Sequence, residues 1–223
     1  MTKKEERLKK QQEKLEAEIA RIEGMKVYER EYESYGLICG IDEVGRGPLA
    51  GPVVAGAVIL PPDIQILYLN DSKKLTERRR ELLYDEIMEK AVAVGIGVIS
   101  QERIDEINIL QATYEAMRQA VGKLTPAPQV LLNDAVTIPG LSQMQVPIIK
   151  GDAKSLSIAA ASVIAKVTRD RMMAALDEKY PGYGFASNKG YGSAAHIAAL
   201  KELGPCELHR RTFIRNFTDG GRG

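Results

Sequence analysis

Two apolar runs flank a glycine-rich turn early in the chain, and this arrangement restricts the fold more than any other feature. The first run, residues 37–41, leads directly into the adjacent acids Asp42 and Glu43, and the second covers residues 53–60. Apolar runs of this length, joined by a turn that contains glycine, are typical of neighbouring antiparallel strands. Burying an acid there is costly unless a partner or a cation offsets its charge. The acid pair therefore suggests a metal-assisted site that acts on an anionic molecule.

Strand and helix patterns alternate through the rest of the chain. Further strands are predicted over residues 93–100, 129–133 and 146–150, and helices over 76–90, 104–123, 157–179 and 193–203. Thr76 is a suitable N-cap for the first of these helices, which is expected to present one face composed of Leu82, Leu83, Ile87 and Met88. A sheet covered by helices, in an α/β or α+β arrangement, accounts for this order.

Length and composition indicate one globular domain. With 223 residues, 44% of them hydrophobic, the chain is long enough to build a proper core. No apolar run approaches the roughly 20 residues that span a bilayer, and the charged start of the chain lacks the apolar centre of a signal peptide. Two distant cysteines, Cys39 and Cys206, suggest reduced thiols rather than a disulfide. We therefore expect a cytoplasmic protein with no membrane segment.

Residues 1–34 differ in composition from the rest of the chain and are predicted to form a charged helical extension to a domain over residues 35–223. Lysine plus arginine and glutamate number nine each in this segment, so its net charge does not mark a nucleic-acid-binding arm. A thin apolar stripe repeats at helical spacing through Leu8, Leu15, Ile19 and Ile22. A solvated helix laid against the domain explains the pattern, and a pairing surface or an accessory substrate contact is the alternative.

Two further acids, Asp134 and Asp152, come after apolar stretches as Asp42 does. Functional groups of α/β proteins gather at strand ends, so these acids and Glu43 are candidates for one cluster. Carboxylate oxygens suit Mg²⁺ or Mn²⁺, and two such ions can activate a water and stabilise the leaving group when a phosphodiester is hydrolysed. The chain has only 2 histidines, which disfavours zinc and histidine-based catalysis. The alternative is that Asp134 or Asp152 merely caps a turn.

The acid–glycine run from Gly40 to Val53 resembles the signature of the ribonuclease HII family, the type 2 ribonucleases H. Further blocks continue the resemblance in the family's order, across roughly residues 36 to 215: Asp71–Leu75, Asn133–Ala135, Lys150–Ser155, Ala159–Asp170, Tyr183–Phe185 and Asn188–Gly192. A lone pair of adjacent acids would be weak support, but six ordered blocks are specific. The resemblance implies a ribonuclease H-like α/β fold, with a mixed central sheet flanked by helices and a helical C-terminal segment.

The resemblance also implies roles for single residues. Asp42, Glu43, Asp134 and Asp152 match the family's acidic quartet, which holds the metal ions. The loop after the first two acids, Gly45, Arg46 and Gly47, corresponds to the segment that senses a ribose 2′-hydroxyl through its backbone.

Three residues outside the acids are further candidates for substrate contact. Tyr191, between two glycines, matches the tyrosine that packs on a sugar at the RNA–DNA junction, although an ordinary core tyrosine is the alternative. Lys73 and Lys189 are expected to contact phosphates, which positions the duplex without reading its sequence. A solvated surface lysine is a nearly equal alternative for Lys189.

Other residues in the matching blocks receive structural roles. Asp170, on the predicted long helix, is expected to pair with a neighbouring Arg or Lys rather than to join a metal shell. The small residues 158–162 are expected to let their helix approach the sheet closely, with no chemistry of their own. His196 is expected to face solvent or to find a local partner.

Together these observations predict a monomeric, metal-dependent endonuclease that uses Mg²⁺ or Mn²⁺. Its substrates would be RNA–DNA hybrids and duplex DNA with embedded ribonucleotides, nicked 5′ to the ribonucleotide to leave 3′-hydroxyl and 5′-phosphate ends. A ribonuclease HIII-like enzyme that needs longer RNA tracts is one alternative, and a catalytically silent hybrid-binding protein is another. Arg46 followed by Gly47, Pro48 and Leu49 favours type 2, as does the lack of a large N-terminal binding domain.

Overall fold

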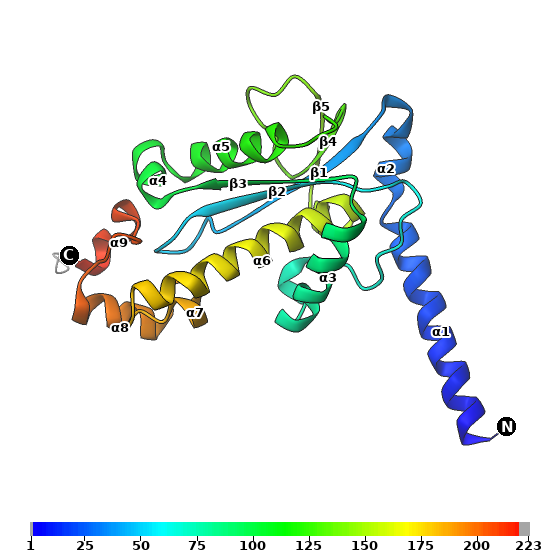
Figure 1. Cartoon of the computed structure of the whole chain (residues 1–223), viewed down its shortest axis with the longest axis horizontal. Coiled ribbons are helices and arrows are strands. Elements are labelled where there is room, and N and C mark those ends of the chain that lie inside the picture. The colour runs from blue at the N-terminus through cyan, green and yellow to red at the C-terminus, as the bar shows by residue number, and fades with distance from the viewer. Residues whose placement is uncertain (1, 219–223) are drawn as a thin grey trace.

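A five-stranded mixed sheet forms the centre of the computed structural model, which describes residues 2–218 (Figure 1). Residues 219–223 of the predicted domain lie outside the described part. The strands lie in the order β3-β2-β1-β4-β5. Their bounds are β1 Ile38–Val44, β2 Val53–Ile59, β3 Ala93–Ile99, β4 Val130–Asp134 and β5 Met144–Ile148.

Pairing within the sheet confirms the predicted hairpin. Strands β1 and β2 are antiparallel, with Asp42 opposite Gly56, and β3 extends the antiparallel part. On its other side β1 pairs in parallel with β4, where Gly40 lies opposite Leu132, and β4 pairs in parallel with β5. The parallel pairing brings the ends of β1 and β4 to the same edge of the sheet.

Helices cover both faces of the sheet, as Figure 1 shows. Helix α5 (Ile109–Gly122) packs on β2 and β3 from one side, and the 24-residue α6 (Leu156–Lys179) packs on β1 and β2 from the other. The single helix predicted over 104–123 is wrong, because α4 (Gln101–Ile107) ends at Asn108. That residue has φ 68° and caps α5 by accepting from the amides of Leu110 and Gln111.

The contact between α6 and the sheet is unusually close, and glycines on the strands make it possible. A Cβ at Gly40 would lie 2.1 Å from the carbonyl carbon of Ser157, and one at Gly56 would lie 2.5 Å from the oxygen of Ala161. The expectation that residues 158–162 permit close packing is confirmed, since these α6 residues are buried against the sheet.

Helix α3 (Glu77–Lys90) begins where the sequence predicts. The Thr76 hydroxyl accepts from the amide of Arg79, which satisfies one of the free N–H groups at the helix start. The predicted buried face is only half right. Leu83 and Ile87 are buried, but Leu82 and Met88 are 57% and 46% exposed.

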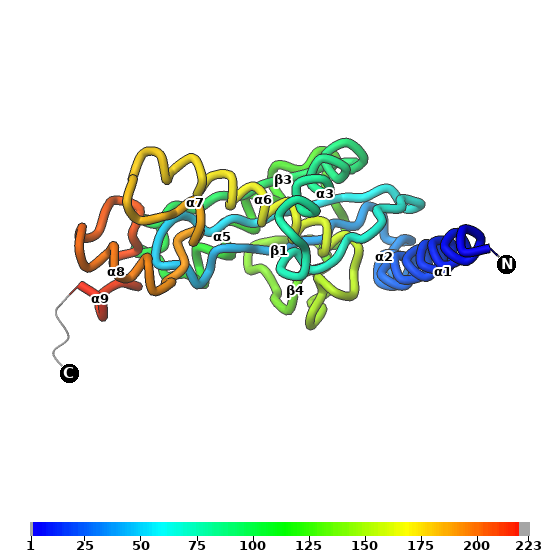
Figure 2. Tube along the Cα trace, turned by 90° about the horizontal axis from the view of Figure 1, so that it is seen from below, coloured from blue at the N-terminus to red at the C-terminus, as the bar shows by residue number. Residues whose placement is uncertain are grey.

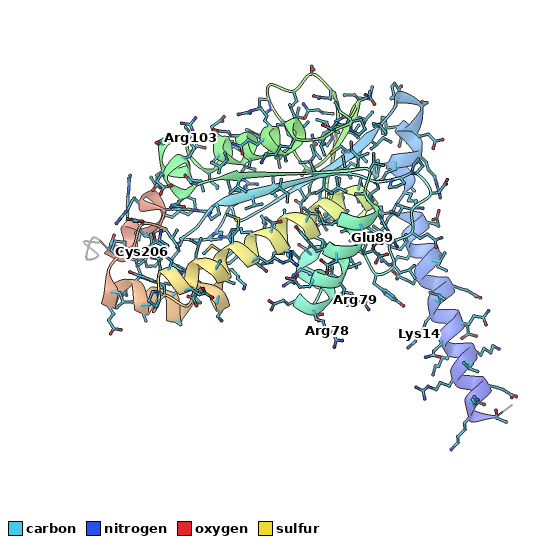
Figure 3. All side chains as sticks on the ribbon, viewed as in Figure 1. Lys14, Arg78, Arg79, Glu89, Arg103 and Cys206 are labelled. Atoms are coloured by element: carbon cyan, nitrogen blue, oxygen red, sulfur yellow. The ribbon has the colours of Figure 1, made fainter. Side chains whose placement is uncertain are left out.

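The N-terminal segment forms α1 (Lys3–Gly24), α2 (Val27–Tyr32) and the 3₁₀ turn η1 (Glu33–Tyr35). Figures 1 and 2 show α1 extending away from the sheet at the end opposite the C-terminus. Figure 3 shows charged side chains along this helix, Lys14 among them. The apolar stripe divides accordingly: Leu8 and Leu15 are exposed, whereas Ile22 is buried against α3 and α6 residues.

Three helices complete the predicted C-terminal segment: α7 (Phe185–Asn188), α8 (Ala194–Leu203) and α9 (Arg211–Thr218). His196 is fully buried, so the solvent-facing alternative for it is wrong. Its Nδ1 bonds the carbonyl of Tyr191, and its Nε2 lies 3.1 Å from Nε2 of His209. Both cysteines are free thiols, as predicted. No helix within residues 2–218 is long and apolar enough to cross a bilayer.

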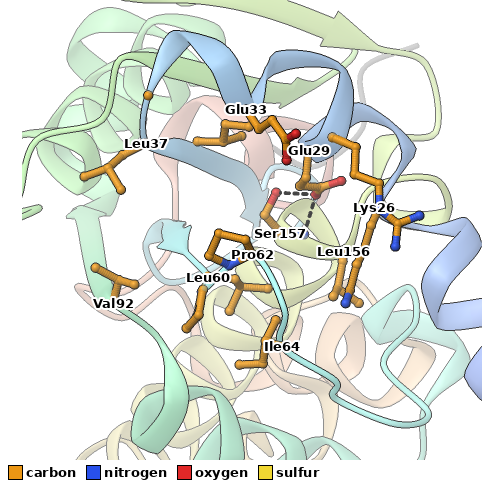
Figure 4. Close-up of a pocket in the computed structure, with 14 residues that line it drawn as sticks. Lys26, Glu29, Glu33, Leu37, Leu60, Pro62, Ile64, Val92, Leu156 and Ser157 are labelled. Carbon is orange, nitrogen blue, oxygen red and sulfur yellow. Dashed lines mark hydrogen bonds between the residues drawn. The ribbon is translucent and has the colours of Figure 1, made fainter.

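A small pocket of about 130 Å³ lies beside the start of β1 (Figure 4). Its walls are mainly apolar and come from α2, the start of β1 and the loop around Pro61. Glu29 accepts hydrogen bonds there from the amide and hydroxyl of Ser157. Because the pocket is at the opposite end of β1 from Asp42, it is separate from the candidate site.

Candidate active site

Asp42 and Glu43 lie within the last part of β1 rather than after it, because the strand continues to Val44. Alternation along the strand sends their side chains to opposite faces of the sheet. Asp42 is buried on the α6 face, where its Oδ1 accepts from the amide of Glu43 at 2.8 Å and the nearby hydroxyl of Ser162 opposes the rise in its pKa. Glu43 forms an ion pair with Arg46 at 3.3 Å. One strand thus presents two acids with different surroundings.

Asp134 and Asp152 reach the same edge from two other segments. Asp134 ends β4, and its Oδ1 accepts from the amide of Gly151 at 2.8 Å. Asp152 lies in the adjoining 3₁₀ turn η3 (Gly151–Ala153) and is half-buried. The Gly151 amide therefore ties the two acid-bearing segments together.

A fifth acid, Asp71, lies beside Asp152 and was missed at the level of sequence. Its carboxyl lies close enough to Asp152 to raise the pKa of that acid, and its Oδ1 accepts from the amide of Lys73. That bond caps the 3₁₀ turn η2 (Ser72–Lys74). Asp is a common capping residue at the start of a turn, but only the fold reveals that Asp71 lies beside Asp152.

Mutual repulsion marks these carboxylates as one cluster. Burial, and then the charge of Glu43, raises the pKa of Asp42 well above its ordinary value. Burial and the charge of Asp134 raise the pKa of Glu43, against the opposing effect of Arg46. Burial, and then Asp71 and Asp134, raises the pKa of Asp152. The site therefore holds more negative charge than its cations offset.

Lys73 is the cation that faces this cluster. Burial alone would lower the pKa of its ammonium group, but nearby carboxylates outweigh burial and raise it. The contributing acids, in order of effect, are Asp42, Asp71, Asp152 and Asp134. Lys73 is therefore placed to meet a phosphate that approaches the acids.

The glycine-rich loop lies next to Glu43 and carries the other predicted contacts. Gly45 has φ +92°, and a Cβ there would lie 2.3 Å from Nε of Arg169, so only glycine fits. The half-exposed ring of Tyr191 packs on the other side of the loop, within 4 Å of where a Gly47 Cβ would be. Lys189 lies in the same segment as Tyr191, but its Nζ turns back to the carbonyl of Ala186.

Two residues on α6 clarify what the helix does. Asp170 pairs with Lys166 at 2.7 Å and with Arg80 at 3.7 Å, which confirms the predicted ion pair. Ser162, by contrast, is more than a packing residue. Its hydroxyl donates to that of Ser72 at 2.9 Å and lies near the carboxylate of Asp42, so it joins α6 to η2 beside the site.

A hard divalent cation fits this arrangement. The donors are carboxylate oxygens, the type that Mg²⁺ and Mn²⁺ prefer, and the raised pKa values show negative charge that a cation would offset. Within residues 2–218, no three Asp, Glu, His or Cys side chains lie close enough together to hold a metal ion by themselves. An open arrangement suits ions that take part of their shell from water and substrate phosphate.

The comparisons with known proteins agree with this geometry. The family model for Ribonuclease HII matches residues 39–216. The chain is 69% identical to a ribonuclease HII of Lachnoclostridium phytofermentans over 206 residues, which cover 92% of this chain and 81% of the relative. A crystal structure of ribonuclease H2 from Pyrococcus horikoshii superposes with a TM-score of 0.67 at 29% identity, covering 82% of this chain and 97% of the other.

The structural likeness extends to type 3 enzymes at the level of the fold alone. Bst-RNase HIII in complex with Mn²⁺ superposes with a TM-score of 0.59 at 18% identity, over 75% of this chain and 61% of the other. These neighbours confirm the predicted ribonuclease H-like fold, but only the sequence match separates the two types. On that match, the chain belongs to the ribonuclease HII family.

Proposed function

We propose that this protein is a divalent-metal-dependent endonuclease that cuts RNA joined to or paired with DNA. It hydrolyses the RNA strand of RNA–DNA hybrids and nicks duplex DNA 5′ to an embedded ribonucleotide, leaving 3′-hydroxyl and 5′-phosphate ends. The observation that carries the proposal is the convergence of Asp42, Glu43, Asp134 and Asp152, from three separate segments, on one edge of the sheet. Membership of the ribonuclease HII family supports the same reaction.

The four acids would hold Mg²⁺ or Mn²⁺, most simply as a two-ion site. Such ions orient the attacking water and stabilise charge on the leaving 3′-oxygen. The protein's own contribution is to fix the acids beforehand: the amide of Glu43 holds Asp42, and the amide of Gly151 holds Asp134. Lys73 then attracts the phosphate to a cluster that would otherwise repel it.

Substrate choice would depend on the sugar rather than on the bases. The backbone of Gly45, Arg46 and Gly47 can approach a ribose closely, because two of its three residues lack side chains. Tyr191 presents an exposed ring edge beside this loop and would pack on the neighbouring deoxyribose. Lys189 remains a candidate phosphate contact at the same end.

The chain's organisation is part of the proposal. Residues 1–34 would be a helical extension of a catalytic domain over residues 35–223, and the enzyme would act as a monomer. The second half of the extension packs on the domain, where Glu18 accepts from the amide of Tyr68 and Arg21 donates to the carbonyl of Leu69. Light scattering on the purified chain tests the monomer.

The first experiment uses duplex DNA with a single embedded ribonucleotide, in Mg²⁺, in Mn²⁺ or in chelator. One nick 5′ to the ribonucleotide, absent in chelator, is the expected result. Cleavage confined to a long RNA–DNA hybrid would favour the ribonuclease HIII-like alternative. Binding without cleavage of either substrate would favour a silent hybrid-binding protein.

Asp134→Asn tests the metal role of one acid without disturbing its neighbour. An amide oxygen can still accept from Gly151, so the segment should stay in place while the charge is lost. We expect cleavage to be abolished and the circular dichroism spectrum to be unchanged. Asp85→Asn, whose side chain is 74% exposed on α3, is the matched control and should cleave normally. Full activity of Asp134→Asn in Mg²⁺ would remove Asp134 from the site.

A further inference from the structure

Two fully buried arginines donate hydrogen bonds to the backbone of the glycine-rich loop that follows Glu43. Neither arginine belongs to the predicted site. Arg169 lies on α6, and Arg210 immediately precedes α9; both are 0% exposed. Within residues 2–218 neither guanidinium forms an ion pair with a carboxylate. Their N–H groups donate to backbone carbonyls instead, which is how these buried charges are compensated.

Arg210 binds both ends of the loop. Its Nη2 donates to the carbonyl of Gly45 at 2.6 Å and to that of Gly51 at 2.8 Å, while its Nη1 donates to the carbonyl of Arg46 at 2.9 Å. Burial, and then the positive charge of Arg169, lowers the pKa of Arg210 to about 9, so the group stays charged at neutral pH. The two ends of the turn are therefore fastened to one rigid, planar cation.

Arg169 joins the same loop to the segment that carries Tyr191. Its Nε and Nη2 donate to the carbonyls of Pro52 and Ala50, at 2.9 and 3.1 Å. Its Nη1 donates to the carbonyl of Lys189 at 2.8 Å, and the ring centroid of Tyr191 lies 5.9 Å from its guanidinium carbon. One side chain thus sets the spacing between the two segments proposed to read adjacent sugars.

The grip of Arg210 has a consequence for the amides of the loop. In a planar trans peptide the C=O and the following N–H point in opposite directions. Because the carbonyls of Gly45 and Arg46 point at Arg210, the amides of Arg46 and Gly47 point away from it. Neither amide donates to another group in the described part of the chain. Both remain available to a ligand.

We infer that Arg169 and Arg210 are positioning residues that give the enzyme its selectivity for a ribonucleotide. Arg210 aims the free amides of the loop, and Arg169 holds Tyr191 at a fixed distance from them. This inference rests on the proposed function, since it deepens how the same site distinguishes ribose from deoxyribose. Arg169 meets Lys189 only at its backbone carbonyl, while the ammonium group of Lys189 bonds the carbonyl of Ala186, and Lys73 bonds neither arginine in the described part of the chain. We therefore expect affinity for duplex DNA as such to depend little on the two arginines.

The test compares two affinities for each protein. Fluorescence anisotropy measures binding to a duplex with one ribonucleotide and to the same duplex made entirely of DNA. Binding is measured in chelator and also in Mg²⁺. In Mg²⁺ every protein carries Asp134→Asn, so that the substrate is not cleaved during the measurement. The variants are Arg210→Lys and Arg169→Lys, which keep the charge but lose the planar fork. Arg211→Lys is the matched control, because Arg211 is exposed and adjacent to Arg210.

In Arg210→Lys we expect the preference for the ribonucleotide duplex to fall about tenfold, roughly the effect of one lost charge-assisted hydrogen bond. Affinity for the all-DNA duplex should change less than about twofold, since phosphate contacts remain, and Arg211→Lys should match the parent. An equal loss of affinity for both duplexes would show a purely structural role and overturn the inference. An unchanged preference for the ribonucleotide duplex, in whichever of the two lysine variants folds, would also overturn it. If the arginine variants still cleave but lose the preference for the ribonucleotide duplex, the proposed reaction is unaffected. If the wild-type protein does not cleave, both the proposed function and this inference are refuted.

Discussion

Gly40→Ala should separate α6 from the sheet, because the added methyl group has no room. The new Cβ would lie 2.1 Å from the carbonyl carbon of Ser157, where ordinary contact begins at 3.4 Å. The obstacle is backbone, so no side-chain rotation relieves it, and the helix must move by about 1.3 Å. Overpacking of this kind costs about 3 kcal/mol, which lowers the melting temperature of a chain of this size by about 6–12 °C.

The same displacement of α6 should also reduce the nuclease activity. Gly40 and Asp42 face α6 from the same side of β1, so a shifted helix withdraws Ser162 from Asp42. Thermal unfolding followed by circular dichroism measures the stability, and nicking of the one-ribonucleotide duplex measures the activity. Gly24→Ala, at the end of α1 with open space around it, is the control and should melt at or slightly above wild type. A Gly40→Ala protein that melts within about 1 °C of wild type would refute the packing argument.

Three further perturbations have defined signs. Because its surroundings raise the pKa of Asp42, its ionised carboxylate destabilises the fold at neutral pH. Asp42→Asn should therefore raise the melting temperature in chelator while abolishing cleavage. A lower melting temperature would contradict this. Thr76→Ala should cost about 1 kcal/mol in urea unfolding by freeing the amide of Arg79, whereas Thr76→Ser should be close to neutral. Burial, and then His196, lowers the pKa of His209 to about 4. Since the unfolded histidine titrates near 6.5, stability from this group is present above about pH 6.5 and is lost as pH falls towards 4. A His209→Gln protein should show a flatter stability profile over that range, and an identical profile would exclude the effect.

Much of the fold can be predicted from local patterns, and the errors have local causes. The glycine turn predicts the β1–β2 hairpin because chain direction reverses there in few residues. Only half of the helical face predicted on α3 is buried: Leu83 and Ile87 are buried, whereas Leu82 and Met88 are apolar yet exposed. Asn108 breaks the predicted helix because its left-handed backbone and its capping side chain stop one helix and start another. The spacing of apolar residues alone does not predict such a break in a helix.

The residues of the candidate site also fall into those that local sequence patterns predict and those that they do not. Asp42 and Asp134 could be chosen as candidates from sequence because each follows an apolar run. Asp71, Ser162 and Arg210 could not, because their importance comes from contacts between segments far apart in the chain. Asp71 meets Asp152, and Arg210 meets Gly45, 165 positions away. These contacts depend on how separate segments of the chain pack together, which no local pattern encodes.

The parallel pairing of β1 with β4 also has a consequence for biosynthesis. The two strands that carry Asp42 and Asp134 cannot pair until the hairpin partner β2, strand β3 and helices α3 to α5 have been made. Contacts between residues so far apart in sequence form late in folding. A nascent chain that still lacks residues 130–152 therefore has no complete set of acids. If the four acids act as proposed, we expect no nuclease activity from a nascent chain until Asp134 and Asp152 have been synthesised.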